Sequence, residues 1–184
     1  MAVDITEHEG IARWQDDLLP RIVDRLGNER PHGVYSMWAT PGGKGLRTIT
    51  YHELANAVNG LAGWLVARLG PGRGVVDPEV LTYIGSNDVR YVVLLLAAIK
   101  AGYVVFLTSP RNSLTAHRSL FEQLRCQTLL TSDPVPPHAL AVINGVKPRH
   151  LTVPSVDELL EQQYPPLVWD KTFQEARWDP LMIM

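Results

Sequence analysis

The alternation of apolar strands with helices between residues 80 and 131 constrains the fold more than any other feature. Three short, largely apolar runs in this stretch have the length of strands: 80–84, 103–107 and 127–131. Helical segments, expected over 88–100 and 114–124, separate them. Strands without a solvent-facing side that are joined by helices form parallel sheets covered on both faces. The sequence therefore predicts an α/β fold with a largely parallel sheet flanked by helices, built on a βαβαβ core at 80–131.

The helix expected over 88–100 is apolar on nearly every side, which predicts a buried helix rather than an amphipathic one. Ser86 or Asn87 is expected to cap its first turn. Lys100 lies at the end where the helix dipole favours a cation, and Gly102 can take the left-handed conformation that ends a helix. These signals predict a helix that joins two neighbouring strands of the sheet.

Thr50 and Glu53 mark the clearest helix start in the chain, because they have the spacing of a capping box. The threonine oxygen can accept the amide proton of the third helical position, and the glutamate can reach back to the amide of the threonine. Apolar residues then recur at helical spacing from Leu54 to Leu69, and Gly70 ends the pattern. A long helix with one apolar face is the prediction.

Residues 34–38 and 46–49 predict an N-terminal hairpin, because the Pro-Gly-Gly-Lys-Gly cluster at 41–45 reverses the chain between two strand-like runs. The cluster invites comparison with a phosphate-binding loop. That motif needs two glycines five positions apart, followed at once by Lys and then Ser or Thr. This spacing is absent, so a flexible hairpin tip is the favoured interpretation.

The first thirty residues carry weaker signals. Thr6 with Glu9 could open a helix, and Pro20 suits the first turn of another helix, where a missing amide proton costs nothing. We therefore divide the chain into an N-terminal extension, residues 1–19, and one partial domain, residues 20–184.

The elements expected after residue 131 are short and are separated by prolines. They are a helix ending at Asn144-Gly145, a strand over 150–153, a helix opened by a Ser155/Glu158 capping box, and an extended stretch over 163–180. The last four residues, 181–184, are all apolar, which is typical of the opening of a buried strand rather than of a frayed terminus. The sequence is thus expected to break off within a structural element.

Composition excludes several classes of function. A formal charge of −2 and a pI near 6.3 provide no field that would attract phosphates, so neither nucleic acid nor a membrane surface is an expected partner. A lone Cys126 excludes an intramolecular disulfide and favours a reducing, cytoplasmic location. The longest apolar run, 91–99, is far shorter than the ~20 residues of a membrane helix, and no targeting signal opens the chain.

A search for catalytic motifs yields no predicted site residue of any kind, whether catalytic, cofactor-binding or metal-binding. The six histidines lack metal-ligand spacing, and the turn at 85–89 has neither Gly-x-Ser-x-Gly nor Gly-x-Gly-x-x-Gly. His117 and Cys126 could be cast as base and nucleophile, but a packed core thiol is the favoured interpretation. Arg111 follows a strand at the edge where such sheets bind ligands, although a packing role is favoured for it.

Four segments, in order, resemble the N-terminal part of adenylate-forming enzymes. They are Thr50-Tyr51-x-Glu53-Leu54, Tyr83-Ile84-Gly85-x-Asn87-Asp88, Ala98-Ile99-Lys100-Ala101-Gly102-Tyr103 and Ser109-Pro110-Arg111-Asn112-Ser113. The first and third look like the first two core motifs of that superfamily, which includes acyl-CoA synthetases and the adenylation domains of peptide synthetases. The fourth is similar to what fungal synthetase-like carboxylic acid reductases carry.

The resemblance implies a family that activates carboxylic acids as acyl-adenylates with ATP and Mg²⁺, in a secondary-metabolism setting. The phosphate loop, the adenine- and ribose-binding motifs and the catalytic lysine of that family are expected beyond residue 184. The resemblance therefore implies an incomplete N-terminal subdomain that binds no cofactor and has no adenylation activity alone.

Two alternatives remain open from the residues. The chain could be a docking module that associates with separately supplied adenylation subdomains or with a carrier domain, because a missing neighbour leaves apolar surface exposed. It could also be an independent small α/β enzyme whose site has no recognisable motif.

Overall fold

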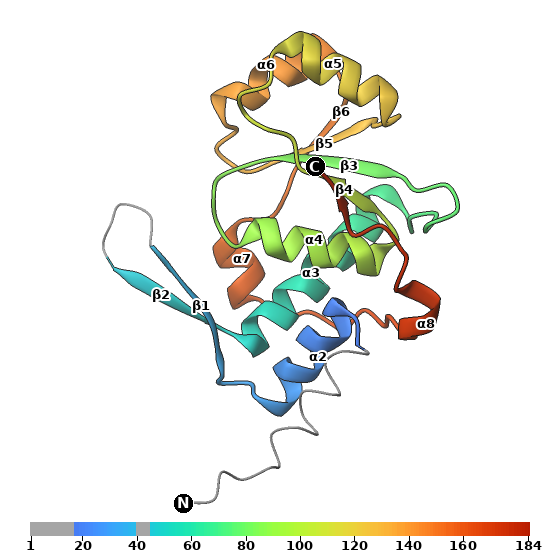
Figure 1. Ribbon diagram of the computed structural model, residues 1–184. Helices are drawn as coiled ribbons and strands as arrows, with labels where there is room; N and C mark the ends of the chain where they lie inside the picture. Colours follow the sequence, from blue (N-terminus) through green and yellow to red (C-terminus); the bar gives the residue numbers. More distant parts are fainter. Residues whose placement is uncertain (1–16, 40–44) are drawn as a thin grey trace, which may run out of the picture.

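A parallel five-stranded sheet forms the centre of the molecule (Figure 1). The computed structural model describes residues 17–39 and 45–184. The strand order is β6-β5-β3-β4-β7, and every neighbouring pair runs parallel. The strands are β3 (Val80–Ile84), β4 (Val104–Phe106), β5 (Thr128–Thr131), β6 (Arg149–Thr152) and β7 (Met182–Ile183). The predicted α/β fold and its βαβαβ core at 80–131 are confirmed.

Helices cover both faces of this sheet (Figure 1). One face carries α2 (Leu19–Glu29), α3 (Tyr51–Leu69), α4 (Arg90–Ala101) and α7 (Val156–Glu161), and the other carries α5 (Leu114–Gln123) and α6 (Pro137–Val146). Side chains alternate along β3, so that Leu81 and Tyr83 join the apolar cluster under α3 and α4, whereas Val80 and Ile84 join the cluster under α5 and α6. Within the described ranges, no helix is both long and apolar enough to cross a bilayer.

The predicted N-terminal hairpin is confirmed and lies apart from the main sheet. Strands β1 (Val34–Ala39) and β2 (Leu46–Thr50) pair antiparallel, with an irregularity between Val34 and Ser36. Most of the expected hairpin tip, residues 41–44, lies outside the described residues, as does the possible helix start at Thr6 and Glu9.

Helix α3 begins as its sequence predicts. The Glu53 amide donates to Oγ1 of Thr50 over 3.2 Å, and Oε2 of Glu53 accepts from the Thr50 amide over 2.7 Å. Both halves of the capping box are therefore formed. Gly70, at φ +89°, ends the helix, and the apolar stripe from Leu54 to Leu65 is buried.

Helix α4 is buried as predicted, but the expected cap at Ser86 or Asn87 is wrong. The helix begins at Arg90, two residues later than expected, and the Arg90 amide donates to Oδ1 of Asp88 over 2.9 Å. A carboxylate at this position also interacts favourably with the positive end of the helix dipole, so it replaces the neutral cap. Gly102 ends the helix in the left-handed conformation, as expected.

Lys100 lies in the last turn of α4, where the helix dipole favours a cation, as predicted, and its charge is also buried and paired. Its side chain is 1% exposed, and Nζ donates to both carboxylate oxygens of Asp24 on α2 and to Oδ1 of Asn59 on α3. The ammonium group thus joins three helices in the interior of the molecule. Burial of a charge requires such partners.

Two asparagines of α3 hold a segment that we call the strap, residues 162–167. Nδ2 of Asn56 donates to the Gln162 carbonyl over 2.7 Å, and Oδ1 accepts from the Tyr164 amide over 3.0 Å. Oδ1 of Asn59 accepts from the Leu167 amide over 3.1 Å. Both carboxamides are therefore structural, since they satisfy backbone groups of an irregular segment.

The segments around the short helices differ in part from expectation. Pro20 lies in the first turn of α2, as predicted, and Ser155 caps α7 by accepting from the Glu158 amide, the first of the two expected hydrogen bonds. The extended stretch over 163–180 is interrupted by a one-turn helix, α8 (Phe173–Ala176), so that prediction is wrong there. A Thr172/Glu175 capping box, overlooked in the sequence, starts this helix.

The apolar C-terminal residues form a strand, as predicted. Met182 and Ile183 of β7 pair with Val105 and Phe106 of β4, and the Leu107 amide donates to the Ile183 carbonyl over 3.0 Å. The strand is half-buried rather than buried, because it lies at the edge of the sheet.

Candidate functional site

The sheet topology singles out one place for a functional site. After β3 the chain passes through α4 to β4, the neighbour of β3 on one side. After β5 it passes through α6, over the opposite face of the sheet, to β6, which lies on the other side of β5 (Figure 1). Where neighbouring strands part in this way, a crevice opens outside their carboxyl ends, and open α/β sheets bind ligands there. The candidate site is therefore the region beyond Ile84 and Thr131, which we call the switch point, and the cavity there is the switch-point cavity.

A cavity of about 580 Å³ occupies this position. It is lined by the turns that follow β3 and β5, by the start of α7 and by the hairpin, with Ser86–Arg90, Asp133, Pro134, Ser155–Asp157, Leu160, Trp38, Arg47 and Ile49 contributing. The two turns are joined directly, because the Ser86 amide donates to Oγ of Ser132 over 3.0 Å. This hydrogen bond links the two turns, and Trp38, Ile49 and Leu160 make part of the cavity lining apolar.

The cation at the base of the cavity is already neutralised. The guanidinium of Arg90 forms a two-pronged interaction with Asp88, in which Nε lies 3.0 Å from Oδ1 and Nη2 lies 2.7 Å from Oδ2. Asp88 also accepts from the Arg90 amide at the first turn of α4. In nucleotide-binding folds the phosphate takes this position at a helix N-terminus. Here the carboxylate of Asp88 occupies it.

The second arginine of the cavity, Arg47 on β2, is likewise committed to carboxylates. Its Nη1 lies 3.1 Å from Asp157 and 3.6 Å from Glu161 on α7, and its Nη2 lies 3.9 Å from Glu53. With Asp133 also in the lining, acidic groups outnumber basic ones. The cavity therefore favours a neutral or cationic group over a triphosphate.

A buried tyrosine lies beside the β3–α4 turn. The Tyr83 ring packs edge-on against Tyr91 at 4.9 Å between centroids, and its hydroxyl has no hydrogen-bond partner among the described residues. Burial raises the pKa of the Tyr83 hydroxyl well above its ordinary value, and the field of Asp88 raises it further while that of Arg90 opposes the shift. The phenol is therefore neutral at any physiological pH, which excludes a role as a base.

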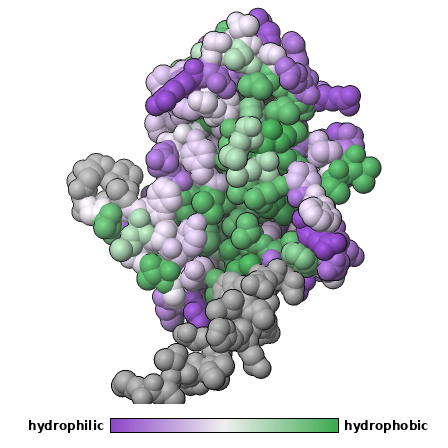
Figure 2. Space-filling view, viewed as in Figure 1, coloured by the Kyte–Doolittle hydropathy of each residue, from purple (hydrophilic) through white to green (hydrophobic). Residues whose placement is uncertain are grey.

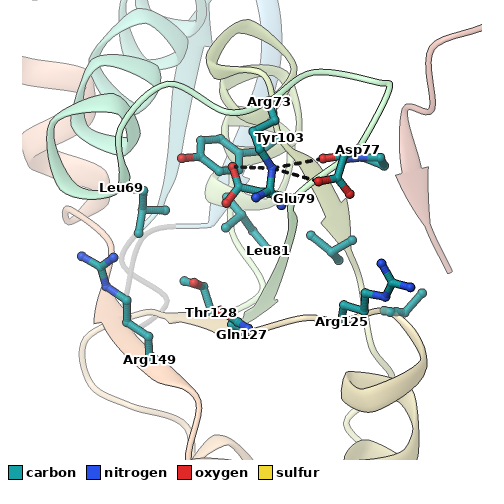
Figure 3. A pocket seen from close by; sticks show the side chains of 13 residues that line it. Leu69, Arg73, Asp77, Glu79, Leu81, Tyr103, Arg125, Gln127, Thr128 and Arg149 are labelled. Carbon is teal, nitrogen blue, oxygen red and sulfur yellow. Dashed lines mark hydrogen bonds and ion pairs between the residues drawn. The ribbon is translucent and has the colours of Figure 1, made fainter.

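A second cavity, of about 370 Å³, lies at the opposite edge, around the amino ends of β3 and β5 (Figure 3). Two of the arginines that line it have partners: Nε of Arg73 lies 3.3 Å from Asp77 and 3.9 Å from Glu79, and Nη2 of Arg149 donates to the Arg68 carbonyl in the last turn of α3. A cation at a helix C-terminus stabilises the helix. These contacts favour a structural role for this edge.

The residues considered in the sequence search do not converge. Arg111 is exposed after β4 and does not line the switch-point cavity. Cys126 is buried against Oγ1 of Thr82 at 3.1 Å, and burial raises the pKa of its thiol, as expected for a core residue. Nδ1 of His117 contacts the Ser113 carbonyl instead of the thiol. Among the residues that the structure describes, no cluster of His, Cys, Asp or Glu could hold a metal ion.

Residues 25–184 match the AMP-binding enzyme family. The chain belongs to this family. The match extends over most of the chain, and it confirms the resemblance that the capping-box and Lys-Ala-Gly-Tyr segments indicated. Members of this AMP-binding family form adenylates with ATP, and the acidic lining and paired arginines at the switch point do not fit a triphosphate.

Two curated fungal relatives support the assignment. The AMP-binding chain is 34% identical over 140 residues to a carboxylic acid reductase of Neurospora crassa. The aligned region makes up 76% of this chain and 13% of the reductase. It is 31% identical over 172 residues to the isocyanide synthase-NRPS hybrid crmA of Aspergillus fumigatus, covering 91% of this chain and 11% of the relative. The chain thus spans about an eighth of the length of these relatives.

Solved structures share the fold. VinN superposes with a TM-score of 0.61 at 20% identity, over 79% of this chain and 34% of VinN. A benzoate CoA ligase of Burkholderia xenovorans superposes with a TM-score of 0.60 at 15% identity, over 80% of this chain and 29% of the ligase. The AMP-binding chain therefore corresponds to about a third of such structures.

Sequence reasoning missed the residues that define the switch-point cavity. Asp88 and Arg90 are two positions apart in a turn, and their pairing depends on where α4 begins. Arg47 meets Asp157 from 110 positions away, which no local pattern reveals. The serine that follows β5, Ser132, is a signal that could have been used, because it lies at the carboxyl end of a predicted strand.

Proposed function

We propose that residues 17–184 are the scaffold portion of an adenylation domain, and that this portion neither binds ATP nor activates a carboxylic acid by itself. The complete domain would form an acyl-adenylate, and the fungal relatives favour a setting in secondary metabolism. In this proposal the sheet and its helices support groups that other parts of such a domain contribute.

One observation carries the proposal: the N-terminus of α4, at the switch point, is occupied by the protein's own carboxylate. Asp88 binds the Arg90 guanidinium and amide together, so both the helix dipole and the nearby cation are already used. A triphosphate would have to displace Asp88 and then lie beside Asp133 and Asp157. Repulsion between like charges in a partly buried cavity opposes that exchange.

ATP–pyrophosphate exchange by the purified 184-residue chain tests this proposal. The assay uses a panel of aryl and alkyl carboxylic acids, with the complete adenylation domain of the Neurospora crassa carboxylic acid reductase as the positive control. We expect exchange by the control and none above background by the chain. Exchange that increases in proportion to the concentration of the chain would refute the proposal.

A second candidate function, a docking module, is favoured by the partly exposed apolar residues of α4 and by the exposed apolar residues of the C-terminal segment, such as Leu181. In this alternative, adenylation subdomains or a carrier domain would be supplied by another polypeptide. Purification of the chain from its native host, followed by mass spectrometry, tests it. A stoichiometric adenylation-domain partner supports docking, and recovery of the chain alone argues against it.

A further inference from the structure

The cavity at the amino ends of β3 and β5, which we call the amino-edge cavity, has an excess of positive charge. Its lining contains three arginines, Arg73, Arg125 and Arg149, but only two carboxylates, those of Asp77 and Glu79 (Figure 3). The chain as a whole has a formal charge of −2. Hydrophobic residues gather in a band down the middle of the face shown in Figure 2, whereas most residues that line this cavity are charged or polar.

The structural contacts of this edge use both carboxylates but the charge of only one arginine. Nε of Arg73 lies within ion-pair distance of Asp77 and of Glu79. Arg149 donates to a backbone carbonyl over 2.7 Å, and a carbonyl does not neutralise its charge. The Arg125 side chain forms no hydrogen bond or ion pair with any described residue. Two cationic groups of the cavity are therefore left without a counter-charge.

The backbone at Arg125 is unusual for an arginine. Arg125 follows the C-terminus of α5 with φ at +49°, in the left-handed region, and the next amide, that of Cys126, donates to the Phe121 carbonyl over 2.8 Å. Glycine is the usual residue at such a position, because a Cβ atom makes this conformation unfavourable. The backbone thus gives no reason for an arginine here. The reason lies in its side chain, either as a cation near the helix C-terminus or as a group that binds a ligand.

The two uncompensated arginines lie on either side of the start of β5. Arg149 pairs in register with Thr128, and Arg125 precedes Thr128 by three positions. Figure 3 shows Thr128 and Gln127 between the two arginines along one wall of the cavity. The Thr128 hydroxyl forms no hydrogen bond with a described residue, although Thr128 is only 8% exposed. Two guanidinium groups and a hydroxyl donor therefore border the same cavity.

We propose that the amino-edge cavity binds a small organic dicarboxylate, with one carboxylate at Arg125 and the other at Arg149. The planar guanidinium group presents parallel N–H donors that match the two oxygens of a carboxylate. The cavity volume of about 370 Å³ lies within the range of small-molecule sites. A triphosphate carries more negative charge than two arginines supply, and it would extend toward Asp77 and Glu79, which repel it. The proposal is independent of the scaffold function, because this cavity lies at the opposite end of the strands from the switch point.

NMR titration of the ¹⁵N-labelled 184-residue chain tests the proposal. The probes are succinate, glutarate and adipate, which differ in the separation of their carboxylates, with acetate and inorganic phosphate for comparison at constant ionic strength. We expect saturable one-to-one binding of at least one dicarboxylate, with shifts of the amide signals at 125, 128 and 149. Its affinity should exceed that of acetate at least about tenfold, or ~1.4 kcal/mol, because two arginines are engaged rather than one.

Variants separate ligand binding by Arg125 from a structural role. Arg125→Gln should weaken binding of the dicarboxylate at least about tenfold. Arg118→Gln is the matched control, because it removes the same charge from an exposed arginine of α5 that donates to the Gly145 carbonyl and does not line the cavity. Arg125→Gly should abolish binding, while the midpoint of thermal unfolding stays unchanged or rises, since glycine adopts the left-handed conformation freely.

Three results would overturn the proposal. The first is no saturable binding of any dicarboxylate, or affinity no higher than that of acetate or phosphate. The second is equal weakening by Arg118→Gln, because only the overall charge would then matter. The third is a lower unfolding midpoint in Arg125→Gly with binding retained, because Arg125 would then stabilise the helix end alone. None of these results changes the outcome of the ATP–pyrophosphate exchange assay, which decides the scaffold proposal separately.

Discussion

Nζ of Lys100 lies 2.7 Å from Oδ2 of Asp24, although the two residues are 76 positions apart in the chain. Their contact joins the C-terminal turn of α4 to the middle of α2, and Asn59 of α3 completes the coordination of the ammonium group at 2.7 Å. Lys100 belongs to the Lys-Ala-Gly-Tyr segment by which the family was recognised. In this structure that lysine has a packing role, since its charge is buried and fully paired within the scaffold.

Removal of one partner of this ion pair should cost more than replacement of the buried charge. Asp24→Ala leaves the ammonium group with Asn59 alone, and we expect a loss of about 3 kcal/mol in the free energy of unfolding. Lys100→Met keeps the volume and leaves Asp24 partly exposed to water, so a loss of about 1 kcal/mol is expected. Urea denaturation measures both. A larger loss for Lys100→Met than for Asp24→Ala would contradict this assignment.

The backbone of the strap should become more mobile when the Asn56 side chain is shortened. Asn56→Ala removes the partners of the Gln162 carbonyl and the Tyr164 amide, and about 2–3 kcal/mol of stability should be lost. Limited proteolysis should then cleave the strap faster, because its backbone is released. Asn144→Ala, at an exposed position of α6, is the control and should leave cleavage unchanged. Equal cleavage rates for the two variants would show that Asn56 does not hold the strap.

Loss of the Tyr83 hydroxyl should not destabilise the fold. The hydroxyl is buried and has no hydrogen-bond partner in the described part of the chain, so the desolvation cost it incurs is not compensated there. Tyr83→Phe keeps the ring and its edge-on contact with Tyr91, and we expect the midpoint of thermal unfolding to stay unchanged or to rise. A fall in this midpoint that corresponds to a loss of about 1 kcal/mol or more in the free energy of unfolding would reveal a hydrogen bond from the hydroxyl to an ordered water.

The capping box of α8 should be visible in a pH titration. The Thr172 amide and hydroxyl donate to the Glu175 carboxylate, and these hydrogen bonds hold the pKa of Glu175 below its ordinary value of 4.5. A lowered pKa stabilises the fold above the unfolded pKa, and this contribution is lost as the pH falls through the folded pKa. In Thr172→Ala the pKa of Glu175 should rise toward 4.5. Carbon-detected NMR titration measures it, and an unchanged value would contradict the capping geometry.

Local patterns predicted most of the fold because its elements are specified by neighbouring residues. The Thr50/Glu53 spacing fixed the start of α3, Gly102 fixed the end of α4, and runs of apolar residues indicated strands with both faces covered. In each case the determining contacts lie within a few positions of one another.

The remainder depended on contacts between distant residues. The shift of the α4 start to Arg90 follows from a carboxylate–guanidinium pair that only the folded turn brings together. The one-turn helix α8 has too few residues for a periodic pattern, so only its Thr172/Glu175 spacing could have revealed it. The ion pair between Arg47 and Asp157 forms only when the hairpin packs against α7.

Equilibrium binding of MgATP to the 184-residue chain, followed by isothermal titration calorimetry, tests the central claim most directly. The account predicts no saturable heat up to millimolar nucleotide, because Asp88 already occupies the helix N-terminus and both cavity arginines are paired. Saturable one-to-one binding with a Kd of about 10 μM or tighter, a free energy near −7 kcal/mol, would contradict it.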